Sequence, residues 1–210
     1  MNKGKFITFE GGEGSGKSTQ LQYLYDKLKE LNIKVKKTRE PGGTDIGEKI
    51  RELLVSGKVD TLSPLTELLL NSASRKEHIE KVIKPTLENG EWILCDRYID
   101  STLVYQGYSH GLDIKMVNYI NDITTSLFKP DLVFIFDISP EEGLKRALKR
   151  KNNEDRYEKM DMSFHNKIRH AYLDISKTDI QKYKVIDSTL DKIEISKIIE
   201  TIITKLYIPY

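Results

Sequence analysis

Residues 11–18 read Gly-Gly-Glu-Gly-Ser-Gly-Lys-Ser, a complete phosphate-binding P-loop of the form G-x-x-x-x-G-K-[ST]. The residues before it, 5–9, form an apolar and β-branched run that is typical of a buried strand. The residues after it, 19–28, carry apolar side chains at helical spacing. A glycine-rich turn that matched by chance would lack these flanks. The motif therefore predicts a strand, loop and helix that bind a nucleoside triphosphate.

The residue types of the P-loop suit this task. Its glycines let backbone N–H groups turn inward around the β-phosphate, and the helix N-terminus adds a favourable dipole. Lys17 can then reach the β and γ oxygens, and the Ser18 hydroxyl can bind Mg²⁺. The predicted nucleotide-binding residues are Gly11, Gly12, Glu13, Gly14, Ser15, Gly16, Lys17, Ser18 and Thr19.

The rest of the chain alternates between strand and helix patterns. Further strands are expected at 33–38, 91–96, 131–137 and 184–187, with helical segments between them and a terminal helix from about residue 190. A basic helix that begins at Ser139-Pro140 is expected to end near residues 152–153. This pattern predicts an α/β P-loop NTPase three-layer fold, a five-stranded parallel sheet flanked by helices. We expect a single P-loop domain over residues 1–210, with a short lid inserted at about 143–158.

Composition narrows the function classes. Lysine and arginine total 34 against 32 acidic residues, a formal net charge of +2, so the charge balance favours neither nucleic acid nor membrane as a partner. No apolar run approaches the length of a membrane span, and no secretory signal precedes the first strand. Cys95 is the one cysteine and sits in an apolar strand pattern, where cysteine usually packs as a small hydrophobe. We expect a cytoplasmic protein.

Polar residues follow the predicted strands, where an open parallel sheet binds its ligands. Asp96 ends an apolar strand and is placed like an acid that holds Mg²⁺ directly or through water. The alternative is that Asp96 only caps the next turn, which is common for aspartate at such corners. Arg97 beside it is expected to point into the same crevice.

A second basic element lies at residues 145–156. Arg146 and Arg150 are four residues apart and share a helical face, and Arg156 follows the Asn152-Asn153 break. Such a segment suits a lid that closes over phosphates and stabilises the transferring group. A solvated basic helix is the alternative, but the P-loop upstream favours the lid. We therefore expect Lys17, Arg97, Arg146, Arg150 and Arg156 to act in catalysis.

The pattern also indicates the class of reaction. The chain has no Asn-Lys-x-Asp guanine-binding motif and is short for a motor ATPase. A small P-loop protein with a second arginine-lined crevice is best interpreted as a phosphotransferase for a small acceptor.

The chain resembles the bacterial thymidylate kinase family over essentially its whole length. The resemblance rests on Phe9–Ser18, Arg39-Glu40-Pro41-Gly42-Gly43-Thr44, Ile50-Arg51, Ala73-Ser74-Arg75, Asp96-Arg97-Tyr98 and Tyr105-Gln106-Gly107. It implies ATP-dependent phosphorylation of dTMP to dTDP, on the route to dTTP, with Mg²⁺ as cofactor. It also implies a homodimer.

The resemblance implies roles for individual residues. Glu13 is similar to an acid that approaches the sugar 3′-hydroxyl, and Tyr105 to a residue that crowds the 2′ position. The dTMP phosphate would be held by Arg97, Arg39 and Arg51, and thymine would be read by Arg75 and Gln106. Gly14 replaces the P-loop arginine of one branch of the family, which indicates the branch whose lid supplies the arginines.

One position departs from the family pattern. Four residues before Arg75, the family usually has a phenylalanine that stacks on thymine, whereas this chain has Asn71. Two other functions stay open from the sequence: a kinase for another nucleoside or nucleoside monophosphate, and a non-catalytic P-loop regulator.

Overall fold

The computed structural model describes residues 4–126, 128–149 and 155–208. Within these residues, the strands form one parallel sheet of order β2-β3-β1-β4-β5. Their bounds are β1 Phe6–Gly11, β2 Val35–Arg39, β3 Trp92–Asp96, β4 Leu132–Asp137 and β5 Tyr183–Asp187. Every predicted strand is present, with ends shifted by one or two residues. The five-stranded parallel α/β fold expected from the sequence is confirmed.

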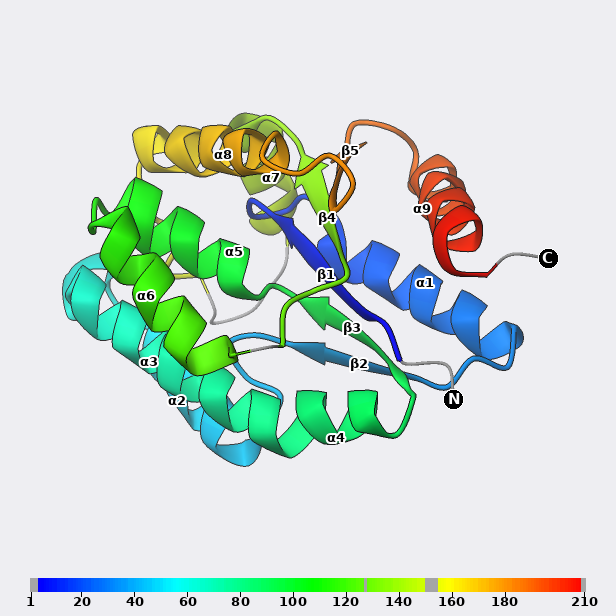
Figure 1. Ribbon diagram of the computed structural model, residues 1–210. Helices are drawn as coiled ribbons and strands as arrows, with labels where there is room; N and C mark the ends of the chain where they lie inside the picture. Colours follow the sequence, from blue (N-terminus) through cyan, green and yellow to red (C-terminus); the bar gives the residue numbers. More distant parts are fainter. Residues whose placement is uncertain (1–3, 127, 150–154, 209–210) are drawn as a thin grey trace.

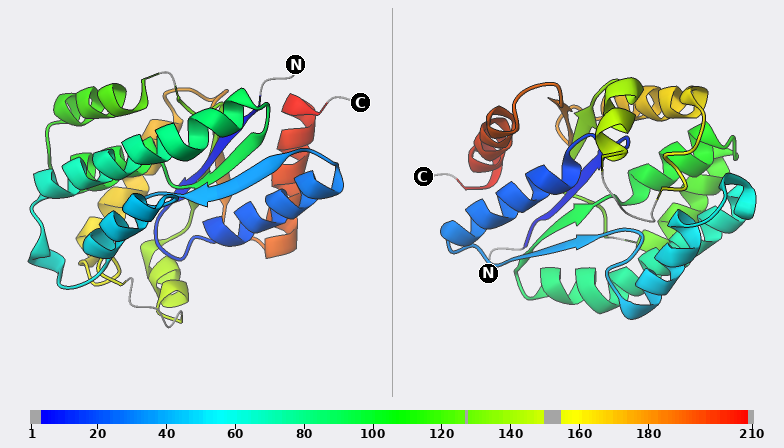
Figure 2. Two further views of the ribbon diagram at one scale, coloured as in Figure 1. Left: turned by 90° about the horizontal axis from the view of Figure 1, so that it is seen from below. Right: turned by 180° about the vertical axis from the view of Figure 1, so that it is seen from behind.

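Helices cover both faces of the sheet (Figures 1 and 2). One face carries α1 Lys17–Glu30 and α9 Lys192–Tyr207. The other side carries α2 Asp45–Val55, α3 Pro64–His78, α4 Lys84–Glu88, α5 Ile99–Thr102, α6 Ile114–Thr125 and α8 Met162–Ser176. π-Helical turns continue α3 at Ile79–Ile83 and α5 at Leu103–Ser109 (η2 and η3), and a short 3₁₀ turn, η1, spans Val59–Thr61.

Strand β4 shows how the sheet separates two cores. Leu132, Phe134 and Phe136 pack with α1 and α9, whereas Val133 and Ile135 pack with α8 and η3. The strand reads as a continuous apolar run because both of its faces are buried, as in other parallel sheets. Because β2, β3 and β1 are parallel neighbours in the sheet, their carboxyl ends lie side by side.

Side chains cap the helices where the sequence indicates. Thr44, Ser63 and Ser139 each accept a hydrogen bond from a backbone N–H of the first turn of α2, α3 and α7 (Pro140–Ala147), respectively. Proline follows at the first helical position of α3 and α7, where its missing N–H costs nothing.

Helix α7 is shorter than the sequence predicts. It spans Pro140–Ala147, and the chain is already in a turn at residues 148–149, so the expected end near residues 152–153 is wrong. A longer helix would place the like charges of Lys145, Arg146 and Lys149 one helical turn apart. Such an arrangement is unfavourable. Only part of the expected lid at 143–158 lies within the described residues.

Candidate active site

The P-loop joins β1 to α1 and surrounds an open crevice of about 540 Å³. The lysine of the motif points back onto its own loop: Lys17 Nζ donates to the carbonyls of Gly11 (3.0 Å) and Gly12 (2.8 Å). Burial and the nearby Arg97 charge lower the Lys17 pKa from 10.5 to about 8. A buried ammonium held by neutral carbonyls is ready to exchange them for anionic phosphate oxygens.

Ser18 and Asp96 meet on the floor of this crevice. The Ser18 hydroxyl donates to Asp96 Oδ2 at 2.5 Å, although 78 residues separate them in the sequence. The register explains the contact, because Phe9 pairs with Asp96 across β1 and β3. One hydroxyl and one carboxylate beside a triphosphate crevice match the donor set through which Mg²⁺ binds, with phosphates and water supplying the rest.

No group of three or more histidine, cysteine, aspartate or glutamate side chains within the described ranges is arranged to hold a metal. Magnesium at phosphate sites needs no such cage, since the substrate completes its coordination. The Ser18 hydroxyl and the Asp96 carboxylate therefore fit Mg²⁺ that is carried with a nucleotide.

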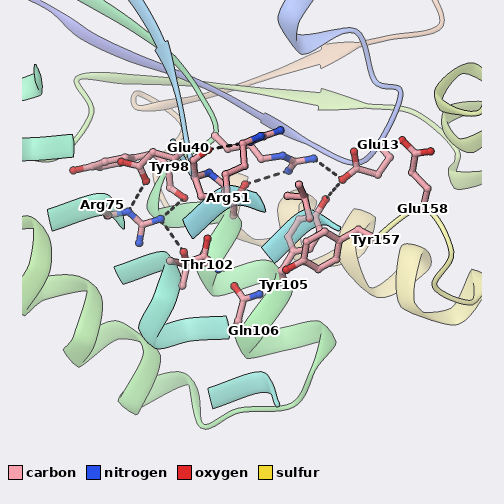
Figure 3. A pocket seen from close by; sticks show the side chains of 15 residues that line it. Glu13, Glu40, Arg51, Arg75, Tyr98, Thr102, Tyr105, Gln106, Tyr157 and Glu158 are labelled. Atoms are coloured by element: carbon pink, nitrogen blue, oxygen red, sulfur yellow. Dashed lines mark hydrogen bonds and ion pairs between the residues drawn. The ribbon is translucent and has the colours of Figure 1, made fainter. Parts of the chain in front are cut away.

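An inner pocket adjoins the P-loop crevice on the side of η3 (Figure 3). It encloses about 100 Å³. Both hollows are lined by Glu13, Glu40, Arg51, Arg97 and Glu158. A molecule in the inner pocket would therefore meet a molecule in the crevice at a boundary of charged side chains.

Arg97 lies at this boundary. Its guanidinium donates to Glu13 Oε1 (2.7 Å) and to the Gly11 carbonyl (3.0 Å), and it stacks 5.0 Å from the centre of the Tyr105 ring. Its backbone has φ 66°, a left-handed conformation that is uncommon for arginine. Strained backbone of this kind often occurs where a side chain is aimed at a ligand.

Glu10 holds the turn that carries Arg97. Its carboxyl group is completely buried and accepts hydrogen bonds from Tyr98 N, Ser101 Oγ and Tyr172 OH at 2.7, 2.6 and 3.0 Å. Burial and the Asp100 charge outweigh these bonds and raise the Glu10 pKa to about 7.

Glu13 contacts two other expected ligand-binding residues, Arg97 and Tyr105. It pairs with Arg97, and Tyr105 OH donates to the same oxygen at 2.8 Å. Burial raises the Glu13 pKa, but the positive charges of Arg97 and Lys17 reverse the effect and lower it to about 2. Burial also raises the Tyr105 pKa, so the phenol stays protonated and donates.

The two expected base readers are at the far end of the inner pocket, and both are 2% exposed. Arg75 donates to Glu40, Asn121, Thr102 and the Tyr98 carbonyl. Gln106 donates from Nε2 to Glu67 at 2.9 Å. These bonds fix both side chains before any ligand arrives.

Arg39 and Arg51 line the crevice from the other side. Arg39 pairs with Glu48 at 2.8 Å and is half-exposed, and Arg51 donates to the Pro41 carbonyl at 3.0 Å. The structure thus brings together Glu13, Lys17, Ser18, Arg39, Arg51, Asp96 and Arg97 around one crevice.

The guanidinium of Arg156 lies among buried acceptors and not beside the P-loop crevice. Its guanidinium is 1% exposed and donates to the carbonyls of Leu54, Lys58 and Val59 and to the carboxylate of Glu67. All of its nitrogens have acceptors away from the P-loop. Arg156 does not line the P-loop crevice in this structure, and its expected role in catalysis stays a prediction.

The other two lid arginines were expected on one helical face. Arg146 lies at the end of α7, where it donates to Glu142 and to the Ser188 carbonyl, both at 3.0 Å. It thereby joins α7 to the loop after β5. Arg150 lies outside the described residues.

Comparison with known proteins agrees with this geometry. The thymidylate kinase family profile matches residues 9–199. The chain belongs to the thymidylate kinase family. A thymidylate kinase of Sulfurihydrogenibium sp. is 48% identical over 188 residues, 90% of this chain and 91% of that one. One of Desulfosudis oleivorans is 44% identical over 87% of this chain and 88% of its own. The crystal structure of thymidylate kinase from Ehrlichia chaffeensis superposes with a TM-score of 0.79 at 36% identity, covering 96% and 99% of the two chains.

Gly14 shows why this member of the thymidylate kinase family has no P-loop arginine. Gly14 has φ +66°, and a Cβ there would lie 1.9 Å from the Gly143 carbonyl oxygen. The backbone of α7 therefore occupies the space that any side chain at position 14 needs. A P-loop arginine is excluded unless α7 moves.

Sequence reasoning missed several residues of the site. Glu40 stands inside the quoted Arg-Glu-Pro-Gly-Gly segment, yet its part in holding Arg75 and His78 follows only from the fold. Glu158 lines both hollows, and its signal was its position directly after Arg156-Tyr157. Glu67 gave no signal, because nothing in α3 distinguishes a buried acid from an exposed one.

Proposed function

We propose that this chain transfers the γ-phosphoryl group of ATP to dTMP, giving ADP and dTDP, as its family does. The observation that carries the proposal is the shared boundary at Glu13 and Arg97 between the P-loop crevice and the inner pocket. A donor and an acceptor bound in these two hollows meet beside the guanidinium of Arg97. Holding them there supplies most of what phosphoryl transfer requires.

ATP occupies the P-loop crevice in this proposal. Lys17 leaves the Gly11 and Gly12 carbonyls and binds the β and γ oxygens, where its charge opposes the charge that develops on the leaving group. Ser18 and Asp96, which are hydrogen-bonded to each other here, would hold Mg²⁺. The ion would supply further neutralisation of the phosphates.

dTMP occupies the inner pocket, with its phosphate toward Arg97, Arg39 and Arg51. Arg97 is already aimed by the Gly11 carbonyl and by the hydroxyls of Ser101 and Tyr172. Glu13, ionised at neutral pH, accepts from the sugar 3′-hydroxyl. Tyr105 leaves little room at the 2′ position, and Arg75 and Gln106 meet the base.

No general base is needed for this reaction. The acceptor phosphate is itself anionic, so its oxygen attacks without first losing a proton to the protein. The site accordingly offers positive charge and alignment. Arg97 holds the attacking phosphate and Lys17 neutralises the moving group, while Arg146, Arg150 and Arg156 remain predicted lid contributors.

A dimer of two copies is proposed on the family resemblance. Exposed apolar side chains on neighbouring helices support it: Leu65 and Leu69 on α3, and Tyr119 and Ile123 on α6, are 43–68% exposed. The variant Leu69→Asp/Ile123→Asp should halve the mass measured by light scattering, whereas Ile180→Asp, also at an exposed residue, should not.

No helix among the described residues is long and apolar enough to cross a membrane. The cytoplasmic location, and the absence of nucleic acid and membrane partners, stay predictions.

Lys17→Ala tests the assignment of the donor site. ADP release from ATP, Mg²⁺ and dTMP should fall by about 100-fold or more, while circular dichroism and thermal melting show an intact fold. Near-normal turnover in this variant would contradict the proposal. A non-catalytic regulator would instead show no dTMP-dependent ADP release in the parent chain.

A further inference from the structure

Glu67 on α3 is a buried carboxylate that contacts Arg156 and two residues that line the inner pocket, Tyr157 and Gln106. Its side chain is fully buried. Arg156 Nη2 donates to Oε1. The second oxygen, Oε2, accepts from Tyr157 OH at 3.0 Å and from Gln106 Nε2 at 2.9 Å.

The partners of Glu67 determine which way the Gln106 amide faces. A guanidinium carries only donors, and a carboxylate paired with it carries only acceptors. The end of the amide that lies 2.9 Å from Glu67 must therefore be the NH₂ group, since the carbonyl end would oppose two acceptors. The orientation is fixed by charge, although the two ends of an amide have almost the same shape.

This constraint leaves the Gln106 carbonyl oxygen for the pocket. Gln106 lines the inner pocket and is 2% exposed, and Figure 3 shows its amide directed from η3 toward Thr102 and Tyr105. Within the residues that the structure describes, no group donates to this oxygen. Arg75, on the same wall, can only donate. The pocket thus presents one fixed acceptor and one fixed donor.

We propose that Glu67 is a positioning residue that determines which pyrimidine the pocket accepts. The inference rests on the proposed function, in which Gln106 meets the base edge. Thymine and uracil offer an N3–H donor beside a C4 carbonyl acceptor, which match Gln106 Oε1 and the Arg75 guanidinium. Cytosine offers an N3 acceptor beside a C4 amino donor, so both contacts are mismatched.

The variant Glu67→Gln should reverse the end of the Gln106 amide that faces the pocket. Arg156 remains a donor and keeps the carbonyl of the introduced amide at the former Oε1 position, so the new NH₂ group faces Gln106. Gln106 must then turn its own carbonyl toward it and its NH₂ group into the pocket. The ratio of kcat/KM for dTMP to kcat/KM for dCMP should fall by about tenfold or more.

Two comparisons separate positioning from a purely structural role. The ratio between dTMP and dUMP should not change in Glu67→Gln, because the two bases share the same hydrogen-bonding edge. The matched variant Tyr157→Phe removes another donor from the same Glu67 oxygen but leaves the Gln106 contact. It should lower the melting temperature without changing the ratio between dTMP and dCMP.

A folded Glu67→Gln protein with the parental ratio between dTMP and dCMP would overturn the proposal. If this variant does not fold, Glu67→Met/Arg156→Met removes the buried pair together, a change that is often tolerated. Its ratio should also fall, because nothing then orients the amide, and an unchanged ratio would equally overturn the proposal.

If Glu67→Gln has no effect, the variant Gln106→Met shows whether the base site or the role of Glu67 was assigned wrongly. An unchanged ratio in Gln106→Met would mean that Gln106 does not read the base, so the assignment of the base site fails. A reduced ratio there, with no change in Glu67→Gln, would refute the role of Glu67 alone. Absence of dTMP phosphorylation by the parent chain would refute the proposed function itself.

Discussion

Arg97 and Glu13 form a 2.7 Å ion pair at the boundary of the two hollows, although they come from different strand ends and are 84 residues apart. Glu13 also accepts from Tyr105, so one carboxylate sets the position of the guanidinium and of the ring beneath it. The acceptor end of the site is therefore formed before ligands bind.

Replacing Arg97 should disable the acceptor site. Arg97→Lys keeps the charge but loses the planar fork that contacts Glu13 and Gly11 simultaneously. We expect kcat/KM for dTMP to fall by about 100-fold, measured by coupled ADP release. Arg169→Lys is the matched control, since Arg169 pairs with Asp137 and is half-exposed. Equal losses of kcat/KM in both variants would show that the effect of Arg97→Lys is not specific to the acceptor site.

Loss of the proton from Lys17 should lower the activity at basic pH. Its pKa of about 8 means that the free protein loses this charge as the pH rises through that value. We expect kcat/KM for ATP to decline by about tenfold per pH unit above pH 8, because this parameter reports the free enzyme. A profile that stays level to pH 10 would show that Lys17 keeps its proton or is not needed.

Glu10 should make the stability depend on pH. Its folded pKa, about 7, exceeds the usual 4.5, so the folded chain binds more protons than the unfolded chain between these values. The stabilisation is complete below pH 4.5 and is lost as the pH rises through 7. The free energy of unfolding of the parent, relative to Glu10→Gln, should fall by about 2–3 kcal/mol over this range.

Denaturant unfolding at several pH values measures this difference. Glu88→Gln, at an exposed position, serves as the control and should follow the parent at every pH. Parallel curves for the parent and Glu10→Gln would contradict the account.

Asn71 marks the departure from the family pattern. It lines the inner pocket, and its amide donates to the Glu67 carbonyl one turn back in α3 at 2.9 Å, so its donor is not aimed at a base. Asn71→Phe should restore a stacking ring and lower KM for dTMP by about two- to tenfold. Asn71→Leu is the control that fills the space without a ring. Equal effects of both substitutions would indicate packing rather than stacking.

The sequence predicted the scaffold well, because the P-loop and the apolar strands are local patterns. Asp96 and Ser18 were predicted to share a site, since strand ends of a parallel sheet converge, and the structure places them in contact. The position of the Arg156 guanidinium could not be predicted from a local pattern. Whether an arginine faces phosphate or buried carbonyls depends on residues such as Leu54 and Glu67, about 90–100 positions away.

Limits of the same kind apply to Gln106 and Glu67. The family resemblance indicated that Gln106 reads the base, but the direction of its amide follows only from a carboxylate on another helix. Likewise, α7 was expected to continue to residues 152–153 because its basic pattern is helical, and it ends at Ala147. The orientation of Gln106 depends on a long-range contact, which no local pattern shows. The like charges near the end of α7 are visible in the sequence, but the pattern alone does not show whether they end the helix.

In the proposed function, the two hollows bring ATP and dTMP into contact. Coupled ADP release with ATP and Mg²⁺ over a panel of nucleosides and nucleoside monophosphates tests it most directly. The account predicts turnover dominated by dTMP, with dUMP weaker, dCMP weaker still, and thymidine inactive because it lacks the phosphate that Arg97 holds. Preferred turnover of thymidine or of another monophosphate, or no dependence on an acceptor, would contradict it.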